Sequence, residues 1–221
     1  MHGDERDSFK EVTVDDDRTR DDALRLGTVV HAALEHAVSK RATLDDADLR
    51  AVVDACADEC GLVSTTLRDE AVTLARRGLN AGVVQRAVSA QRTWTEVPVT
   101  LCERDESGHG IAISRGICDL VFTEGDGLIL VDYKTDRFGA TEPVEYQLER
   151  KVETYRDQVA AYVRALTAAT GLPVAEAWLV FLAASDDGAE CIVPLRSNGG
   201  RASGPLPCGR RSDEHTSEPQ S

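Results

Sequence analysis

Apolar residues recur at helical spacing through the first part of the chain. From Asp22 onward an apolar stripe runs along one broad helical face, made of Leu24, Val30, Ala33, Leu34, Ala37 and Val38. Two further helices are predicted at residues 45–60, with Asp45 or Asp46 as the N-cap, and at residues 66–89. Residues 1–21 are acidic and show no such period, so we expect them to form a disordered leader.

Strand patterns dominate the second part of the chain. Apolar and β-branched runs predict strands at residues 93–102, 117–123, 128–134 and 175–184, the last with a partner at 191–195. Residues 148–169 return to helical spacing, and Gly171-Leu172-Pro173 ends that helix. An order of helices, three strands, helix and strand predicts an α/β fold, with a mixed central sheet flanked by helices and an N-terminal helical segment.

The strands at 117–123 and 128–134 are joined by Glu124-Gly125-Asp126-Gly127, which is a turn signal and predicts a β-hairpin. If this loop is symmetric, residue 123 pairs with 128, 121 pairs with 130, and Asp119 lies opposite Asp132. Side chains at such positions are about 5 Å apart, and two like charges there destabilise a sheet unless something neutralises them. A divalent cation would neutralise them, so the register predicts a metal site.

Lys134 adds an ammonium group to the same hairpin. Because strand side chains alternate between faces, Lys134 shares the face of Asp132 while Tyr133 points away. Val121 and Leu130 lie behind the acids on that face, so the charges stand at the end of an apolar surface. Two carboxylates and an ammonium suit metal-assisted phosphodiester cleavage. The alternative is a surface ion-pair cluster without a catalytic role.

The formal net charge of -14 is the wrong sign for a general nucleic-acid binder, so binding of DNA would need local positive charge. The abundance of aspartate and the scarcity of lysine suggest a salt-adapted protein. No apolar run reaches about 18 residues and the start of the chain does not resemble a signal peptide, so we expect a cytoplasmic protein without a membrane partner.

The six cysteines form no C-x-x-C pair and no zinc-like spacing with histidine, so buried free thiols are predicted, without an iron–sulfur cluster. Residues 196–221 are rich in Gly, Ser, Pro and Arg and are expected to be disordered. The last eleven residues resemble a translated sequencing adapter, so we expect this tail to be an artefact that replaces the natural C-terminus.

Five ordered motifs carry a family resemblance. They are Gly27-x3-His31, Glu96-Val97-Pro98, Gly116-Ile117-Cys118-Asp119-Leu120, Asp132-Tyr133-Lys134-Thr135 and Gln158-x3-Tyr162. Together they resemble the RecB-type nuclease domain of the PD-(D/E)XK superfamily, which is found in RecBCD and AddAB helicase–nucleases. The resemblance covers residues 22–185 and implies a restriction-endonuclease-like core, for which we set the domain limits at residues 22–195.

The resemblance implies a role for each motif residue. The metal ligands would be His31, Asp119, Asp132 and the main-chain carbonyl of Tyr133, and such a donor set suits Mg²⁺ with Mn²⁺ as a substitute. The catalytic residues would be Lys134, Asp132, Asp119 and Glu96, with Lys134 orienting and deprotonating the attacking water and Glu96 acting as an accessory acid. Gln158 and Tyr162 would contact DNA.

For several of these residues a purely structural role remains an alternative. His31 and Tyr162 would then be packed core residues, and Glu96 a solvent-facing strand residue. Basic residues flank the site and could hold phosphates or form a solvated face; these are Arg137, Arg150, Lys151 and Arg156.

The function implied is a Mg²⁺-dependent deoxyribonuclease, exonuclease in preference to endonuclease, that works in double-strand-break repair or recombination. No lysine follows a glycine, so the chain contains no P-loop, and a UvrD-like helicase is expected on the same natural chain or as a subunit. One alternative is a non-catalytic DNA-end-binding or scaffolding module of the same fold. Another is an unrelated α/β protein, which predicts that His31 lies far from Asp119 and Asp132.

Overall fold

The computed structural model describes residues 14–41, 44–104, 111–195 and 208–209. In chain order, these residues form α1 (Val14–Lys40), α2 (Asp46–Cys60), α3 (Thr65–Asn80), α4 (Gly82–Ser89), β1 (Thr93–Arg104), β2 (Ile111–Glu124), β3 (Gly127–Lys134), α5 (Val144–Thr170), β4 (Val174–Phe181), β5 (Ala189–Ile192) and β6 (Cys208–Gly209). The strands lie in one sheet in sequence order, and β3 and β4 run parallel while the other neighbours are antiparallel. The predicted α/β class with a mixed sheet is therefore confirmed.

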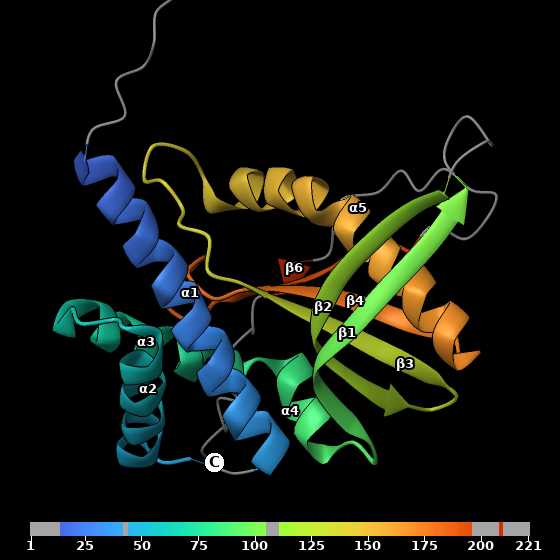
Figure 1. Ribbon diagram of the computed structural model, residues 1–221, viewed down its shortest axis with the longest axis horizontal. Helices are drawn as coiled ribbons and strands as arrows, with labels where there is room; N and C mark the ends of the chain where they lie inside the picture. Colours follow the sequence, from blue (N-terminus) through green and yellow to red (C-terminus); the bar gives the residue numbers. More distant parts are fainter. Residues whose placement is uncertain (1–13, 42–43, 105–110, 196–207, 210–221) are drawn as a thin grey trace, which may run out of the picture.

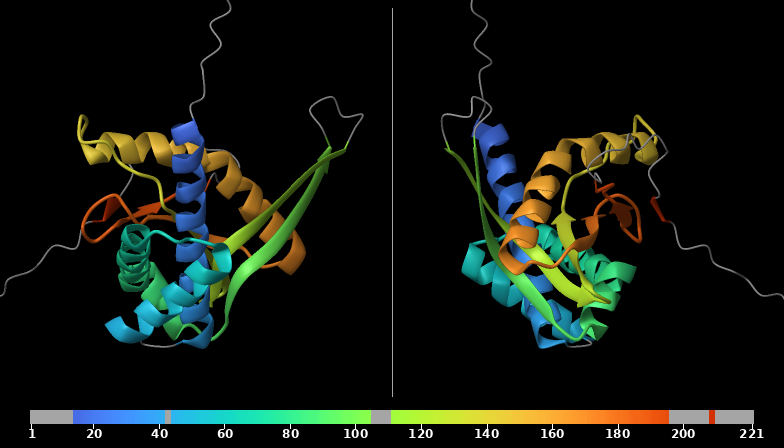
Figure 2. Two further views of the ribbon diagram at one scale, coloured as in Figure 1. Left: turned by 60° about the vertical axis from the view of Figure 1, so that its left-hand side comes forward. Right: turned by 90° about the vertical axis from the view of Figure 1, so that its right-hand side faces the viewer.

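Two helical layers enclose the sheet (Figure 1), with α1 to α4 on one face and α5 on the other. Strand β3 is buried on both sides: Ile129 and Val131 pack against α1 to α4, whereas Leu128 and Leu130 pack toward α5. This explains its unbroken apolar run, because a strand covered on both faces needs no polar positions. Strands β1 and β2 extend past the other strands as a two-stranded arm (Figure 2).

The first helix begins at Val14, eight residues before the predicted start at Asp22. The prediction of a disordered leader is therefore wrong for residues 14–21, while residues 1–13 lie outside the described part of the chain. This first stretch of α1 projects beyond α2 to α4 (Figure 1), and its sequence has no apolar period that would reveal a helix. It also contains no glycine or proline to interrupt the helix.

The predicted helix at 66–89 is two helices, because the backbone at Ala81 leaves the helical region with φ -58° and ψ 135°. Glu190 of β5 stabilises the break: its carboxylate accepts a hydrogen bond from the main-chain N–H of Val83, at 2.7 Å, in the first turn of α4. The cap comes from a residue far along the chain, so no local pattern announces it. Of the two N-caps predicted, Asp45 or Asp46, the structure has Asp45, whose carboxylate accepts the Asp48 N–H at 2.8 Å.

Two further predictions need correction. Cys118 and Cys191 are buried as expected, but Cys56 and Cys60 are only half-buried, and Cys102 is exposed because it lies on the edge strand β1. Cys208 and Gly209, predicted to be disordered, form a short strand beside β5, since main-chain pairing requires no apolar pattern. The remainder of the predicted tail, including the adapter-like residues, lies outside the described residues. None of the described helices is long and apolar enough to cross a membrane.

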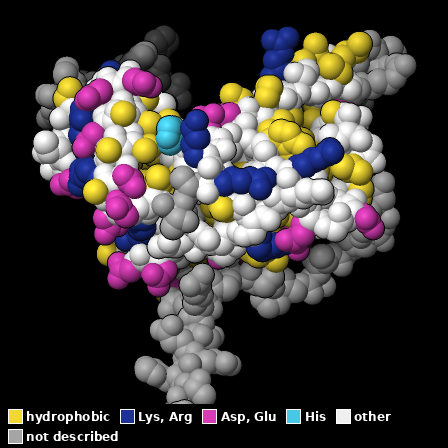
Figure 3. Space-filling view, turned by 90° about the horizontal axis from the view of Figure 1, so that it is seen from below, with side chains coloured by type: hydrophobic (Ala, Val, Ile, Leu, Met, Phe, Trp, Pro, Cys, Tyr) yellow, Lys and Arg dark blue, Asp and Glu magenta, His cyan; other side chains and the backbone are white. Residues whose placement is uncertain are grey.

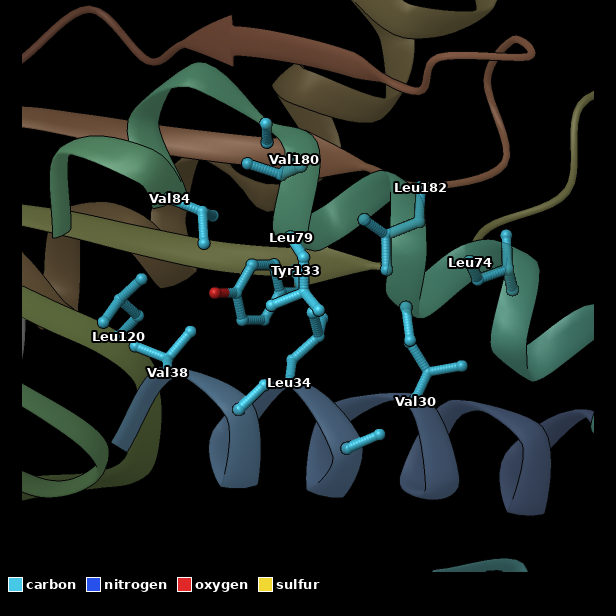
Figure 4. Packing of buried hydrophobic residues seen from close by; sticks show 14 of the residues in the cluster. Val30, Leu34, Val38, Leu74, Leu79, Val84, Leu120, Tyr133, Val180 and Leu182 are labelled. Atoms are coloured by element: carbon cyan, nitrogen blue, oxygen red, sulfur yellow. The ribbon is translucent and has the colours of Figure 1, made fainter. Parts of the chain in front are cut away.

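Tyr133 carries a buried hydroxyl group that has no hydrogen-bond partner among the described residues. Figure 4 shows this oxygen among the apolar side chains of α1, α4 and the sheet. Because an unpaired buried hydroxyl has lost its hydration without compensation, Tyr133→Phe is expected to raise the free energy of unfolding by about 1 kcal/mol. Urea unfolding measures this change. Tyr155→Phe is the matched control, since it removes a hydroxyl that donates to Asp136, and a loss of stability in Tyr133→Phe would contradict the prediction.

Candidate functional site

The site begins where α1 crosses the β2–β3 hairpin. His31 of α1 places its Nδ1 atom 3.2 Å from Oδ1 of Asp119, and its ring lies edge-on to the Tyr133 ring. Gly27, one turn earlier, allows this approach: a Cβ atom there would lie 3.2 Å from Oγ1 of Thr135. The alternative of an unrelated fold, with His31 far from the acids, is therefore wrong.

Glu96 of β1 completes a cluster with His31 and Asp119. One ligand atom from each of these three side chains lies within 4.8 Å of the others. Strand register explains the meeting, because Glu96 stands opposite Asp119, between the pairs Thr95–Leu120 and Val97–Cys118. The side chain of Glu96 is half-buried and turned toward α1, so the alternative of a solvent-facing strand residue does not hold.

The backbone of Glu96 is unusual, with φ at +50°. Positive φ is uncommon for residues other than glycine, and such conformations concentrate at functional sites, where the surrounding structure holds them in place.

Opposite Glu96, the side chains of β2 stop alternating regularly between the two faces of the sheet. Cys118 and Val121 both pack toward α5 although they are three positions apart, and Asp119 between them turns toward α1.

This change of face corrects the predicted position of Asp119. The hairpin pairs 123 with 128 and 121 with 130, as expected, and Val121 and Leu130 share the α5 face. The ladder ends at Leu120–Val131, however, so Asp119 and Asp132 are not a cross-strand pair. Instead, Oδ2 of Asp119 accepts the main-chain N–H of Tyr133 at 2.6 Å, because a side-chain acceptor takes the place of the β2 backbone where the two strands separate.

Asp132 lies next to this cluster and is almost fully buried. Its Oδ2 atom is 2.5 Å from Nζ of Lys134, and both side chains occupy one face of β3 while Tyr133 packs on the other, as predicted. Burial, and then the negative charge of Asp119, raises the pKa of Asp132 to about 6, although Lys134 opposes the shift. The surroundings of Asp132 therefore favour a bound proton or another positive charge near this carboxylate.

The other members of the cluster show the same excess of negative charge. Burial and then the carboxylate of Asp119 raise the pKa of Glu96, with a further contribution from Glu35. Burial acts to lower the pKa of His31, but its hydrogen bond to Asp119 and the charge of that carboxylate outweigh burial, so the net pKa is raised. Carboxylate oxygens with one imidazole suit a divalent cation such as Mg²⁺ or Mn²⁺, so these residues fit the predicted metal.

The main-chain carbonyl of Tyr133 is placed to join these donors. Its N–H points to Asp119, and in an extended strand the N–H and C=O of one residue point to the same edge. The structure thus brings together His31, Glu96, Asp119 and the backbone of Tyr133, with Asp132 and Lys134 directly beside them.

These shifted pKa values predict how stability depends on pH without metal. A carboxyl group with a raised pKa binds more protons in the folded than in the unfolded state. The free energy of unfolding therefore falls as pH rises from about 4 through about 6. The raised pKa of His31 extends this fall above about pH 6.5. Asp132→Asn is expected to raise the melting temperature near neutral pH and to flatten this dependence, measured in EDTA by differential scanning fluorimetry. Asp126→Asn, in the exposed hairpin turn, is the matched control. A lower melting temperature for Asp132→Asn would mean that the pair with Lys134 outweighs burial.

Helix α5 brings the predicted DNA-contacting residues to Lys134. Nζ of Lys134 donates to Oε1 of Gln158 at 3.3 Å, and Nε2 of Gln158 donates to the hydroxyl of Tyr162 at 2.8 Å. Tyr162 packs in the core beneath α5 and also reaches the strand surface at Gly116, where a Cβ atom would lie only 2.4 Å from its ring. The glycine of the motif in β2 is therefore required by the tyrosine of the motif in α5.

A groove of about 270 Å³ runs between the β1–β2 arm and α5. It is lined by Val99, Leu101, Ser114, Arg115, Gly116, Asp157, Gln158, Ala161, Tyr162 and Ala165. Gln158, which lines this groove, also accepts a hydrogen bond from Lys134, so the groove lies beside the lysine.

The flanking basic residues are all engaged in ion pairs. The pairs are Arg137–Glu70, Arg150–Glu142, Lys151–Asp136 and Arg156–Glu153. The alternative of a solvated face is therefore favoured for them. Figure 3 shows the underside of the molecule as it is oriented in Figure 1: most acidic side chains lie on one side of it, together with some Lys and Arg, and further Lys and Arg side chains lie across the rest.

The sequence analysis did not assign two residues that lie next to the site. Glu35 follows His31 by one helical turn and adds negative charge near Glu96. Tyr155 places its ring centroid 4.1 Å from Nζ of Lys134. The spacing of four to His31 and of three to Gln158 puts each on the correct helix face, which is the only local signal for either residue.

The fold agrees with the comparison to known protein families. Residues 8–206 match the PD-(D/E)XK nuclease superfamily, and the chain belongs to this superfamily. An ATP-dependent helicase/nuclease subunit of Acetivibrio thermocellus is 30% identical over 163 residues, which is 69% of this chain and 12% of that protein. The protein of the same name from Bacillus cereus (strain Q1) is 25% identical over 166 residues, or 70% of this chain and 13% of that protein. The predicted membership is confirmed, and the chain spans about one eighth of the length of these relatives.

Proposed function

We propose that this chain is a metal-dependent DNA nuclease domain that hydrolyses phosphodiester bonds. The observation that carries the proposal is the cluster of His31, Glu96 and Asp119 within 4.8 Å, with the buried Asp132–Lys134 pair beside it. An acidic cluster of this kind is costly in a protein without a cation, because like charges repel in a half-buried site.

The residues would divide the chemistry between them. His31, Asp119, Asp132 and the Tyr133 carbonyl would hold the metal, with Glu96 as an accessory acid. Bound there, a divalent cation supplies polarisation of the phosphoryl oxygen and a more acidic water. Lys134, beside the cluster, would orient the attacking water. As a neutral amine it would accept the proton of that water, and the ammonium formed in this way would stabilise charge on the phosphate.

The groove beside α5 would hold the DNA strand. Gln158 and Tyr162 supply polar groups next to Lys134, and Val99 and Leu101 supply apolar surface on the opposite wall. A groove with both characters can contact the phosphate backbone and an unstacked base.

The names of the relatives suggest the wider setting. A chain that matches one eighth of a helicase/nuclease subunit would act with a UvrD-like helicase, on the same natural chain or as a subunit. We infer a cytoplasmic role in double-strand-break repair or recombination, with exonuclease action on DNA and Mg²⁺ as the metal, which Mn²⁺ could replace.

End-labelled linear DNA and circular single-stranded DNA test this proposal, each incubated with purified protein in Mg²⁺, Mn²⁺ or EDTA. We expect loss of the linear substrates only when metal is present, and the release of label from the 5′ or 3′ end gives the polarity. Cleavage of the circle would indicate endonuclease action instead. Binding of DNA without hydrolysis in either metal would support the non-catalytic module and overturn the proposed activity.

A further inference from the structure

Three groups surround the ammonium of Lys134. The carboxylate of Asp132 lies at 2.5 Å, the amide oxygen of Gln158 at 3.3 Å, and the ring centroid of Tyr155 at 4.1 Å. The first two groups attract the ammonium by charge and hydrogen bonding, and the third by the negative face of its ring. The side chain of Lys134 is only 13% exposed, so little water competes with these contacts.

The ring of Tyr155 is itself held in place from two sides. Its hydroxyl lies 3.1 and 3.0 Å from the two carboxylate oxygens of Asp136, which also pairs with Lys151 at 2.6 Å. Behind the ring lies Phe181 of β4, with the ring centroids 6.3 Å apart. Burial, and then the hydrogen bond to Asp136, raises the pKa of Tyr155 to about 12, so the phenol stays neutral and keeps donating.

We propose that Tyr155 is a positioning residue for Lys134, whose ring face holds the ammonium at the end of β3 while Asp136 fixes the ring. This inference rests on the proposed function, because it assumes that Lys134 acts in cleavage. A long lysine side chain has several rotamers, and each wrong rotamer removes its ammonium from the reacting phosphate. Asp132 alone does not select the correct one, because the proposed function makes it a metal ligand as well, and its carboxylate would then be shared between the cation and Lys134.

Replacement of the ring tests the proposal. In Tyr155→Leu we expect kcat for DNA cleavage to fall about tenfold, with KM for DNA unchanged, because the lysine is misplaced while the groove is intact. Tyr155→Phe keeps the ring face and its contact with Phe181 but loses the hydrogen bond to Asp136, so kcat is expected to fall less than in Tyr155→Leu. Tyr146→Leu is the matched control, since Tyr146 lies on the same helix but is 60% exposed.

A second readout does not depend on activity. The chain has only four lysines, at positions 10, 40, 134 and 151, so the ε-methylene signals of Lys134 can be assigned by NMR. The ring of Tyr155 should shift these signals upfield in the wild type and in Tyr155→Phe, and the shift should be absent in Tyr155→Leu.

The outcomes separate the two proposals. A wild type that cleaves no DNA would overturn the proposed function. An active wild type whose kcat is unaffected by Tyr155→Leu would overturn the positioning role alone, as would a Tyr155→Phe variant as defective as Tyr155→Leu. A fall in kcat for Tyr155→Leu in a Lys134→Met background would also overturn it, because a residue that acts through Lys134 has no effect once the lysine is gone.

Discussion

Asp119→Asn is expected to lower kcat/KM for DNA cleavage by at least about 10³-fold and to abolish tight binding of Mn²⁺. Asp119 contacts both α1 and β3, through His31 and the Tyr133 N–H. Asparagine has the same shape and can still accept the hydrogen bond from Tyr133, so the strands should stay in register. What disappears is the negative charge at the centre of the cluster. Isothermal titration with Mn²⁺ and a steady-state cleavage assay measure the two effects.

Asp126→Asn provides the control for this substitution, because it makes the same chemical change in the exposed turn of the same hairpin. The control should bind metal and cleave DNA like the wild type. Normal Mn²⁺ binding by Asp119→Asn would mean that the cluster of His31, Glu96 and Asp119 is not the metal centre.

Lys134→Met is expected to reduce kcat by about 10²- to 10³-fold without weakening Mn²⁺ binding. Methionine keeps the length and apolar volume of the lysine stem but has no charge to place beside the phosphate and no basic nitrogen. Because the ammonium pairs with Asp132 at 2.5 Å, its loss also leaves a buried carboxylate without a counter-charge in the metal-free protein. Metal should therefore stabilise this variant more than the wild type, which thermal unfolding with and without Mn²⁺ would show.

Lys40→Met, on the exposed end of α1, controls for the loss of a lysine. If Lys134→Met is unstable without metal, thermal unfolding of the double variant with Asp132→Asn, which removes the unpaired charge, shows whether that charge causes the instability. Full activity in folded Lys134→Met would exclude the lysine from the chemistry. The two substitutions thus separate the metal centre from the lysine, since only Asp119→Asn should prevent metal binding while both prevent cleavage.

The sequence by itself determined the features that depend on neighbours along the chain. The alternation of apolar and polar residues predicted the strands and the α/β class, and the four-residue turn set the pairing of 123 with 128 and 121 with 130. The same alternation placed Asp132 and Lys134 on one face, and a spacing of four placed Gln158 and Tyr162 on one side of α5. These predictions succeeded because strand and helix periods are local properties of the backbone.

Only the tertiary structure decided how those pieces meet. Asp119 leaves the predicted face because it contacts His31, a residue 88 positions earlier, and the N–H of Tyr133. Glu96 joins them through a backbone conformation, φ +50°, that no residue pattern announces. The end of α3 at Ala81 likewise depends on Glu190, which is 107 positions from the N–H that it caps. Each of these features balances a local cost against a contact between distant segments, and such contacts exist only once the chain has folded.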